Sequence, residues 1–497
     1  MKNGKCIVDK DYIIGEVSPK VFGSFIEHLG RAVYTGIYEP DHPLADAQGF
    51  RKDVLDLVKQ LNVPIVRYPG GNFVSGYNWT DGIGPKKDRP RRLDYAWMSI
   101  ETNEIGIDEF ADWCRKANTE VMAAVNLGTG TPQDAGYMTE YCNFPQGTYW
   151  SDLRRKNGHE QPHNIKTWCL GNEMDGPWQT CSLTAEEYGK KAREAAKIMK
   201  WVDPSVELVA CGSSNTMMPT YPEWDRTVME YTYEDVDYIS MHRYYENEGR
   251  VDDFLASFVN MDSFIKTIAS TADYVKAKTR SNKKLKISFD EWNVWYIKKQ
   301  TRCPWEIAPA IVEDVYSLLD ALVFCGLLCT LLNNTDRVKM ACLAQLVNAL
   351  APIYTQKGGK AIKQATYYPF QQVSLYGRGK ALKTLVSCPT IETQMYGEAP
   401  ILQTAATYNE EDGSVTLFAL NCDQTEDLEL KIDLRSFGEV RLKEHLLMDG
   451  PDLFAQNTFD EPDKVVPRTV NLDGKQDYSS LVLPKLSWNV LRFSIVK

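Results

Sequence analysis

Two hydrophobic patterns alternate along the chain from about residue 20 to about residue 375. Short apolar runs of strand-forming residues are followed by longer segments whose apolar residues recur at helical spacing. The runs predict strands over residues 21–26, 64–67, 121–126, 165–171, 206–212, 236–243, 285–291 and 327–333. The longer segments predict helices over residues 50–61, 107–117, 185–201, 254–278, 310–322 and 339–351. This order indicates an α/β fold, a closed (β/α)8 barrel of the TIM type.

A second pattern, alternation with a period of two, begins after about residue 380. Residues 404–408 and 415–421 flank the turn sequence Glu410-Glu411-Asp412-Gly413, which predicts a β-hairpin. Further strands are expected over residues 428–432, 440–446 and 488–495, and an N-terminal strand over 5–9 could complete a two-sheet β-sandwich. We therefore expect a barrel over residues 19–376 and a sandwich formed by residues 1–18 and 377–497.

A doubly wound open sheet is the structural alternative to the barrel. Such a sheet usually carries a glycine-rich first turn that binds a dinucleotide. The best candidate for that turn, Gly128-Thr129-Gly130-Thr131-Pro132-Gln133, lacks the third glycine. The pattern therefore favours the barrel.

Composition narrows the class of function. The chain has 497 residues, 43% of them hydrophobic, which is enough for a large core and more than one domain. Its 56 basic and 67 acidic residues give a net charge of −11, so nucleic acid is not an expected partner. The start has no apolar run of signal-peptide length, and no segment predicts a membrane span, so we expect a cytoplasmic protein. The twelve scattered cysteines are interpreted mostly as reduced core residues.

Two glutamates follow apolar strands at the positions where a barrel places catalytic groups. Glu173 comes after the strand over 165–171, and Glu291 ends the strand over 285–291. Their spacing fits three strand-plus-helix units of roughly 40 residues, so they would close strands four and seven. A pair of carboxylates is the minimum for cleaving a glycosidic bond. Glu173, with Trp168 and Trp178 nearby in sequence, suits the general acid, and Glu291 suits the nucleophile.

Other polar and aromatic side chains follow the same strand ends. Aromatic rings can stack on the C–H faces of sugars, and amides can bind hydroxyl groups, although each of these side chains also has a purely structural interpretation. The candidates are Glu27, Asn72, Trp97, Asn172, Trp178, Tyr244 and Gln345. His28 and His242 also stand at strand ends but show no metal-ligand spacing, so no metal site is expected.

At these residues the sequence resembles glycoside hydrolase family 51, the α-L-arabinofuranosidases. The likeness covers nearly the whole chain and includes Gly171-Asn172-Glu173 within a longer motif. The matching stretches are residues 25–34, 67–75, 168–178, 288–296 and 344–348. The resemblance implies a barrel with a β-sandwich, retention of configuration through a glycosyl-enzyme intermediate, no required cofactor and often a hexamer.

The resemblance also implies roles for the candidate residues. Glu173 would be the acid/base and Glu291 the nucleophile, while Trp97 and Trp178 would shape the entrance and the leaving-group side. Asn172 would bind the 2-hydroxyl. The residues implied to hold the furanose are Glu27, Asn72, Asn172, Tyr244 and Gln345. We expect the 296–306 loop and the exit of the eighth strand, Asn333-Asn334, to border the leaving-group site.

The expected activity is therefore that of a retaining, exo-acting α-L-arabinofuranosidase. Its substrates would be arabinofuranosyl-containing oligosaccharides or fragments of arabinoxylan and arabinan. A β-xylosidase or endoglucanase using the same carboxylates is the alternative within the enzymes. A catalytically silent carbohydrate-binding or scaffold protein is the alternative outside them, but such a protein need not keep both glutamates.

Overall fold

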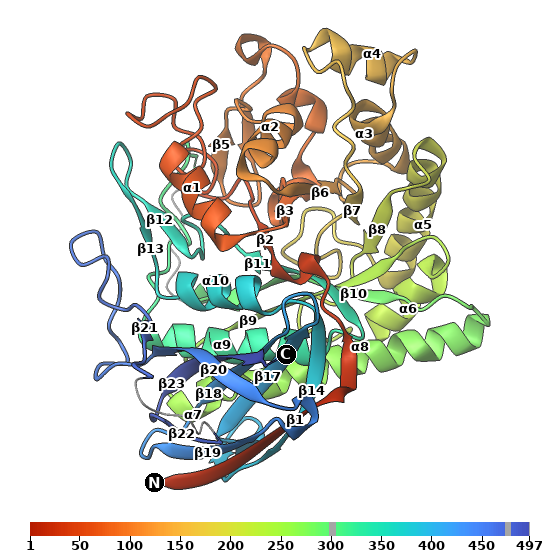
Figure 1. Ribbon diagram of the computed structural model, residues 1–497. Coiled ribbons are helices and arrows are strands. Elements are labelled where there is room, and N and C mark those ends of the chain that lie inside the picture. The colour runs from red at the N-terminus through yellow and green to blue at the C-terminus, as the bar shows by residue number, and fades with distance from the viewer. Residues whose placement is uncertain (298–304, 473–478, 497) are drawn as a thin grey trace.

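The fold consists of a closed barrel and a β domain that contains both ends of the chain (Figure 1). The computed structural model describes residues 1–297, 305–472 and 479–496. Eight parallel strands close the barrel in the order β10-β11-β2-β3-β6-β7-β8-β9, which excludes the open doubly wound sheet. None of the helices in these ranges combines the length and apolar composition that a membrane crossing needs.

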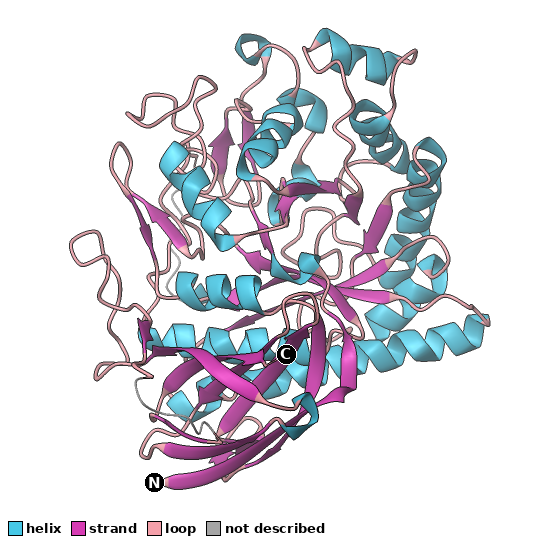
Figure 2. Ribbon diagram, in the orientation of Figure 1, coloured by secondary structure: helices cyan, strands magenta, loops and turns pink. Residues whose placement is uncertain are grey.

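The barrel strands are short, and most of the helices lie outside them (Figure 2). The strands are β2 (Gly23–Phe25), β3 (Ile65–Tyr68), β6 (Glu120–Val125), β7 (Thr167–Leu170), β8 (Glu207–Ala210), β9 (Tyr238–Tyr245), β10 (Lys286–Val294) and β11 (Val338–Ala344). The helices are α1 (Lys52–Leu61), α2 (Ile107–Ala117), α3 (Pro132–Asn143), α4 (Tyr149–Lys156), α5 (Ala185–Val202), α6 (Glu223–Thr232), α7 (Val251–Leu255), α8 (Ser257–Thr279), α9 (Leu318–Asn333) and α10 (Tyr367–Tyr376). Small elements in the connections are β4 (Arg92–Asp94), β5 (Ser99–Glu101), β12 (Ile353–Thr355), β13 (Ala361–Lys363) and the 3₁₀ turns η1 (Pro19–Phe22), η2 (Asn72–Gly76), η3 (Trp79–Gly82) and η4 (Lys86–Asp88).

The prediction for the eighth strand was wrong. Residues 327–333 belong to helix α9, and the strand is β11, which covers most of the first half of the helix predicted over 339–351. Helix α9 contacts β10 on one side and β14, β17, β18 and β23 of the β domain on the other. A helix buried on both sides is apolar all round, so it lacks the polar face that distinguishes a helix from a buried strand. Asn333 and Asn334 bond to Thr404 and Asp262, so they do not form a strand exit.

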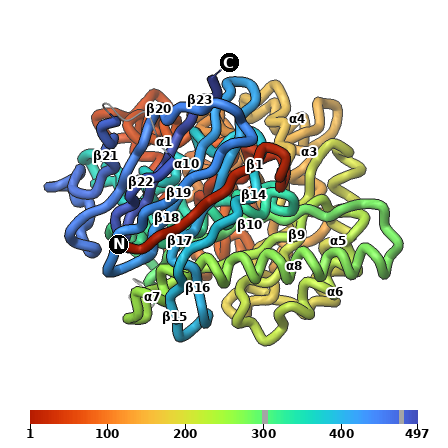
Figure 3. The backbone as a smooth tube through the Cα atoms, turned by 60° about the horizontal axis from the view of Figure 1, so that its bottom comes forward, coloured from red at the N-terminus to blue at the C-terminus, as the bar shows by residue number. Residues whose placement is uncertain are grey.

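In the β domain, nine strands hydrogen-bond into one sheet of order β21-β20-β23-β18-β17-β14-β1-β19-β22. The predicted hairpin is present as β17 and β18, and the predicted N-terminal strand is the middle part of β1. Figure 3 shows β1 among strands from the C-terminal region, where it pairs with β14 and β19 and joins the two halves of the expected sandwich. Bounds are β1 (Lys2–Glu16), β14 (Lys380–Ser387), β15 (Thr390–Thr393), β16 (Gly397–Pro400), β17 (Leu402–Asn409), β18 (Ser414–Asn421), β19 (Leu428–Asp433), η6 (Arg435–Phe437), β20 (Val440–Met448), β21 (Arg468–Thr469), β22 (Ser480–Leu483) and β23 (Ser487–Ile495).

The sheet has two apolar faces, and they belong to different cores. One face closes on itself, because Val8, Leu417, Leu430 and Leu442, from strands across the sheet, share a single cluster. The other face, including Phe418, joins the large core of the barrel helices. We propose the division expected from the sequence, with the barrel over residues 19–376, although the two units share this second core.

The barrel interior is packed rather than hollow. Side chains from seven of the eight strands form one cluster that includes Phe25, Met122, Cys169, Tyr238 and Cys342. Eleven cysteines fall within the described ranges; all are free, and nine are buried. The interpretation of most cysteines as reduced core residues is confirmed for this part of the chain.

Substitution of Trp488 tests how much the core shared by the barrel and the β domain contributes to stability. It is fully buried, and its indole Nε1–H donates to Gln372 Oε1 on α10 at 2.8 Å. Trp488→Ala should lower the free energy of unfolding by about 3–5 kcal/mol, because it leaves a cavity between the two units and an unpaired amide. Trp201→Ala, at a side chain that is 75% exposed, is the control and should change it by no more than about 0.5 kcal/mol. Equal urea midpoints for the two variants would contradict this account.

Candidate active site

A cavity of about 1090 Å³ opens among the ends of the barrel strands. Eight of the nine residues predicted for the site line it: Glu27, Asn72, Trp97, Glu173, Trp178, Tyr244, Glu291 and Gln345. The ninth, Asn172, has no exposed surface and lies behind the wall, where Arg67 donates to its Oδ1 and its Nδ2 donates to Asn72 Oδ1 at 3.3 Å. Residues 298–304 of the loop expected to border this site lie outside the described ranges.

The loop after β7 turns Glu173 into the cavity. Gly171 and Glu173 both have left-handed backbones, with φ of 94° and 43°. This conformation is rare for a glutamate and is typical of functional sites. Trp178 donates its indole N–H to Glu173 Oε2 at 2.7 Å. A Cβ on Gly176 would lie 2.5 Å from that indole, so a glycine is required for the loop to fold back.

Glu291 owes its position to an irregularity in β10. The pairing of β10 with β9 shifts register between Ser288 and Glu291. In a regular strand, adjacent side chains point to opposite faces, but a bulge can re-aim one of them. As a result, both Asp290 and Glu291 reach His242 on β9, at 3.3 and 3.5 Å.

Glu173 and Glu291 are close to each other. One carboxylate oxygen of each, together with His242 Nδ1 or Nε2, falls in a group whose atoms all lie within 4.8 Å of one another. Inverting glycosidases hold their carboxyl groups roughly 6.5–9.5 Å apart to admit a water molecule, whereas retaining enzymes hold them about 5–5.5 Å apart. The spacing here suits two carboxylates that act on the same carbon atom.

Two buried cations contact the Glu173 and Glu291 carboxylates. Arg67 Nη1 donates to Glu291 Oε2 at 3.1 Å, and its Nε lies 3.6 Å from Asp290. His242 Nδ1 lies 2.9 Å from Glu173 Oε1. Burial alone would lower the pKa of His242, but the carboxylates of Glu291, Asp290 and Glu173 outweigh burial and raise it to about 10. His242 is therefore an imidazolium at neutral pH.

The two cations and the three carboxylates around them form one cluster, and their charges define how many protons it carries. Burial alone would raise the pKa of Asp290, but His242 and Arg67 lower it, so this carboxylate is ionised. Burial and the charge of Glu173 raise the pKa of Glu291, while His242 and Arg67 oppose that rise. Two cations thus face three carboxylates, and one proton on the Glu173–Glu291 pair makes the cluster neutral. This is the protonation state that acid catalysis beside a nucleophile needs.

Glu27 lines the cavity and is almost fully buried. Its Oε1 accepts hydrogen bonds from the Phe73 backbone N–H and the Trp97 indole, both at 2.9 Å, and its Oε2 accepts one from Gln345 at 3.2 Å. Burial raises the pKa of Glu27 to about 8, despite these donors. A Cβ on Gly71 would lie 2.3 Å from Glu27 Oε2, so the Gly70-Gly71 pair makes room for this carboxylate.

Sequence reasoning missed the groups behind the wall. Arg67, Asp290 and His242 stood inside or beside the motifs already singled out, but they were given no role. The available signal was a charged residue at the end of an otherwise apolar strand, since a buried charge requires a partner. The sequence does not reveal the partners of these three residues, because the partners come together only when β2, β3, β7, β9 and β10 close into one barrel.

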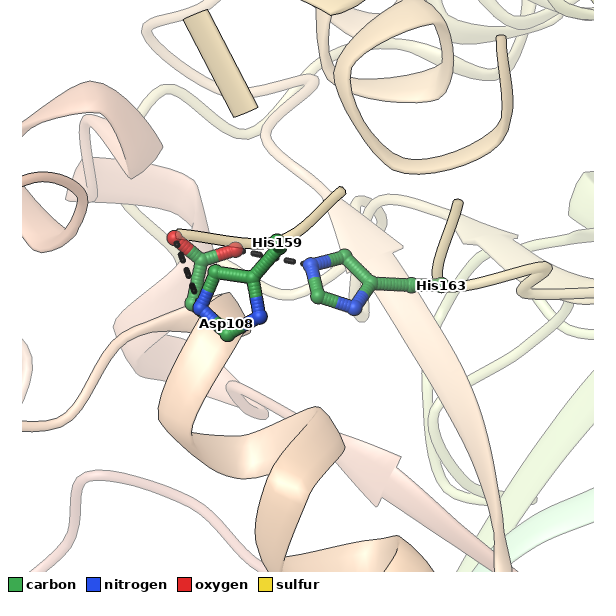
Figure 4. A group of neighbouring side chains, drawn as sticks. All are labelled: Asp108, His159 and His163. Carbon is green, nitrogen blue, oxygen red and sulfur yellow. Dashed lines mark hydrogen bonds and ion pairs between the residues drawn. The ribbon is translucent and has the colours of Figure 1, made fainter. Parts of the chain in front are cut away.

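A second cluster of possible metal ligands lies away from the cavity (Figure 4). His159 and His163 have the His-Glu-x-x-His spacing, but they lie in the loop after α4 and not on a helix. They face the two oxygens of Asp108 on α2, at 3.9 and 2.7 Å. Tyr141 also donates to Asp108, at 2.6 Å. These contacts satisfy the carboxylate and attach the loop to α2, so the cluster has a structural explanation.

Comparison with known proteins identifies the family. The α-L-arabinofuranosidase 1 domain matches residues 57–264, and the α-L-arabinofuranosidase C-terminal domain matches residues 290–487. The chain belongs to the α-L-arabinofuranosidases of glycoside hydrolase family 51. The predictions of family, fold and glycosidase activity are therefore confirmed.

Relatives match over almost their whole length. The intracellular exo-α-(1→5)-L-arabinofuranosidase 1 of Bacillus subtilis is 53% identical, over 99% of both chains. The exo-α-(1→6)-L-arabinofuranosidase of Bifidobacterium longum is 45% identical, over 99% of this chain and 97% of its own. A solved family 51 α-L-arabinofuranosidase from Bifidobacterium longum superimposes with a TM-score of 0.96 at 44% identity, covering 99% of this chain and 100% of its own.

The contact between Gly71 and Glu27 offers a test of the inner wall. Gly71→Ala should displace the Glu27 carboxylate and lower kcat/KM on an aryl α-L-arabinofuranoside by about 100-fold, because catalysis tolerates little misplacement. Gly76→Ala is the matched control, since its nearest atom would lie 3.8 Å away. If the two variants had similar rates, Glu27 would not shape the sugar site.

Proposed function

We propose that this arabinofuranosidase is exo-acting and retaining, and releases terminal arabinofuranose from short oligosaccharides by double displacement. The observation that carries the proposal is the close approach of the Glu173 and Glu291 carboxylates in a cavity that is also lined by the buried side chains of Glu27 and Gln345. Exo-action is supported by the relatives, whose names describe exo-α-L-arabinofuranosidases.

In the first step, Glu291 attacks the anomeric carbon. Arg67 Nη1 and the Tyr244 hydroxyl, at 3.1 and 2.7 Å, hydrogen-bond its two oxygens, which aims the carboxylate and favours its ionised form. Glu173 donates its proton to the departing glycosidic oxygen as the bond breaks. The products of this step are an arabinosyl ester of Glu291 and a free hydroxyl on the leaving group.

In the second step, water replaces the leaving group. Glu173, now ionised, takes a proton from the water as its oxygen attacks the anomeric carbon, and the ester bond to Glu291 breaks. The net configuration is retained and both carboxyl groups return to their starting states. His242 contacts both residues, so its positive charge stabilises the carboxylate of whichever one is ionised.

Glu27, Asn72, Asn172, Tyr244 and Gln345 are proposed to hold the furanose, and Trp97 and Trp178 to shape the entrance. The Bacillus subtilis relative is named for α-(1→5) bonds and the less similar Bifidobacterium longum enzyme for α-(1→6) bonds. We therefore propose α-(1→5)-linked arabino-oligosaccharides as substrates. The word intracellular in relatives' names supports a cytoplasmic location; the hexamer stays a prediction.

The two glutamates can be tested together. Glu291→Ala should lower turnover of an aryl α-L-arabinofuranoside by several orders of magnitude, on the order of 10⁴-fold or more, because it removes the nucleophile. An aryl β-D-xylopyranoside assayed beside it tests the substrate class. A folded Glu291→Ala enzyme with near-wild-type turnover would disprove the assignment, and activity on the xyloside alone would favour a β-xylosidase.

The effect of Glu173→Ala on kcat/KM should depend mainly on the leaving group of the substrate. Its loss of kcat/KM should be largest for arabinobiose, whose departing alcohol needs a proton, and smallest for an aryl group that leaves as a stable phenolate. Azide, which needs no general base, should restore turnover on the aryl substrate and yield the arabinosyl azide with retained configuration. Equal losses on both substrates and no rescue by azide would exclude the acid/base role.

Removal of the positive charge at His242 should shift the dependence of kcat/KM on pH. Its charge lowers the pKa of Glu291, and the nucleophile must be ionised, so His242→Gln should move the acidic limb of kcat/KM to higher pH by roughly one unit or more. His163→Gln, which alters a histidine–carboxylate contact outside the cavity, should leave the limb in place. An unmoved or more acidic limb in His242→Gln would contradict the electrostatic role.

A further inference from the structure

The cavity is larger than the site for one furanose. Its volume of about 1090 Å³ is at the upper end of the range for sites that enclose a drug-sized ligand. We call the part that is lined by Glu27, Glu173, Glu291 and Gln345 the inner part. We call the part that is lined by the segment after β9 and by three residues of the β domain, Gln394, Met395 and Tyr396, the outer part.

These three residues form the tip of the β15–β16 hairpin, which lies beside α7 (Figure 3). The buried carboxylate of Asp253 on α7 accepts the backbone N–H groups of Gln394 and Met395 at 2.7 and 3.0 Å. Within the tip, the Tyr396 N–H donates to the Thr393 hydroxyl at 3.1 Å. The hairpin is therefore attached to the barrel and presents its tip to the cavity in a fixed conformation, which lowers the entropic cost of binding.

The outer part has the surface chemistry of a saccharide site. Met395 is 58% exposed and Trp178 is 47% exposed, so both present apolar surface to solvent in the cavity that also holds Glu173 and Glu291. Polar side chains alternate with it, including Gln394 from the hairpin. Apolar faces suit the C–H faces of a sugar ring, and amides suit its hydroxyl groups.

The charges of this region favour a neutral ligand. Arg243 and Arg250 line it together with Glu246, Glu248 and Asp253. Arg250 is paired with Asp253 at 2.9 Å. Because two cations face three carboxylates, the region has no net positive charge to select an acidic sugar such as a uronic acid.

We propose that the hairpin tip, Gln394–Tyr396, binds the leaving-group saccharide, so that the β domain contributes to the choice of substrate. The ligand is a neutral pentose chain, with the units beyond the scissile bond lying against Gln394 and Met395. This inference rests on the proposed function, because it assumes that a terminal arabinofuranose occupies the inner part of the cavity.

The test compares two substrates in one variant. The double variant Gln394→Ala/Met395→Ala keeps the backbone N–H groups that bond Asp253 but removes the side chains that face the cavity. The quantity measured is the ratio of kcat/KM on α-(1→5)-arabinotriose to kcat/KM on a small aryl α-L-arabinofuranoside. We expect this ratio to fall about tenfold, which corresponds to about 1.4 kcal/mol of lost leaving-group binding.

The control is Glu392→Ala, an exposed residue of the same hairpin that does not line the cavity; its ratio should equal that of wild type. An unchanged ratio in the double variant, with or without a general loss of rate, would overturn the proposal. Failure of the proposed function is a separate result, because wild-type enzyme would then not hydrolyse the aryl α-L-arabinofuranoside at all.

Discussion

The active site depends on five buried charged side chains that neutralise one another. Arg67, His242, Asp290, Glu173 and Glu291 come from β3, β9, β10 and the loop after β7, and each needs an opposite charge because it is withdrawn from water. The two cations make it possible to bury three carboxylates together, and a single added proton would make the group neutral. A water-filled site would need no such balance, but it would also weaken every interaction with the reacting atoms.

The surrounding structure serves to hold these charges in position. The bulge in β10 brings Asp290 and Glu291 to the same histidine. Left-handed turns at Gly171 and Glu173 bring the second carboxylate of the catalytic pair to the ring nitrogen that Glu291 also contacts. Behind the barrel, α9 is buried against β10 and the sheet of the β domain. The β domain therefore supports the strand that carries Glu291, and through the β15–β16 hairpin it also reaches the mouth of the cavity.

Local patterns in the sequence were sufficient for part of this arrangement. An apolar run followed by a glutamate predicted both Glu173 and Glu291, and the expected strand order, four and seven, is the observed one. The turn sequence before Ser414 predicted the β17–β18 hairpin because its residues favour that turn whatever surrounds them. Helix α2 was predicted with its observed bounds because one face is apolar and the other polar.

The remaining features depend on tertiary contacts that no local pattern contains. Helix α9 is apolar on every side because two units bury it, so its sequence resembles a strand. The roles of Arg67 and His242 arise from partners more than 45 residues away. The tip at Gln394–Tyr396 has an unremarkable sequence, and only its attachment to Asp253 brings it to the cavity.

The most direct test of the account is to find where the sugar becomes attached. The Glu173→Ala enzyme, mixed rapidly with an activated aryl α-L-arabinofuranoside and quenched in acid, should accumulate the ester because its hydrolysis lacks a general base. Peptide mass spectrometry should then find one arabinofuranosyl unit on the peptide containing Glu291, and on Glu291 itself after fragmentation. Attachment to another residue, or a product of inverted configuration with no labelled peptide, would contradict the double displacement and the assignment of Glu291 as its nucleophile.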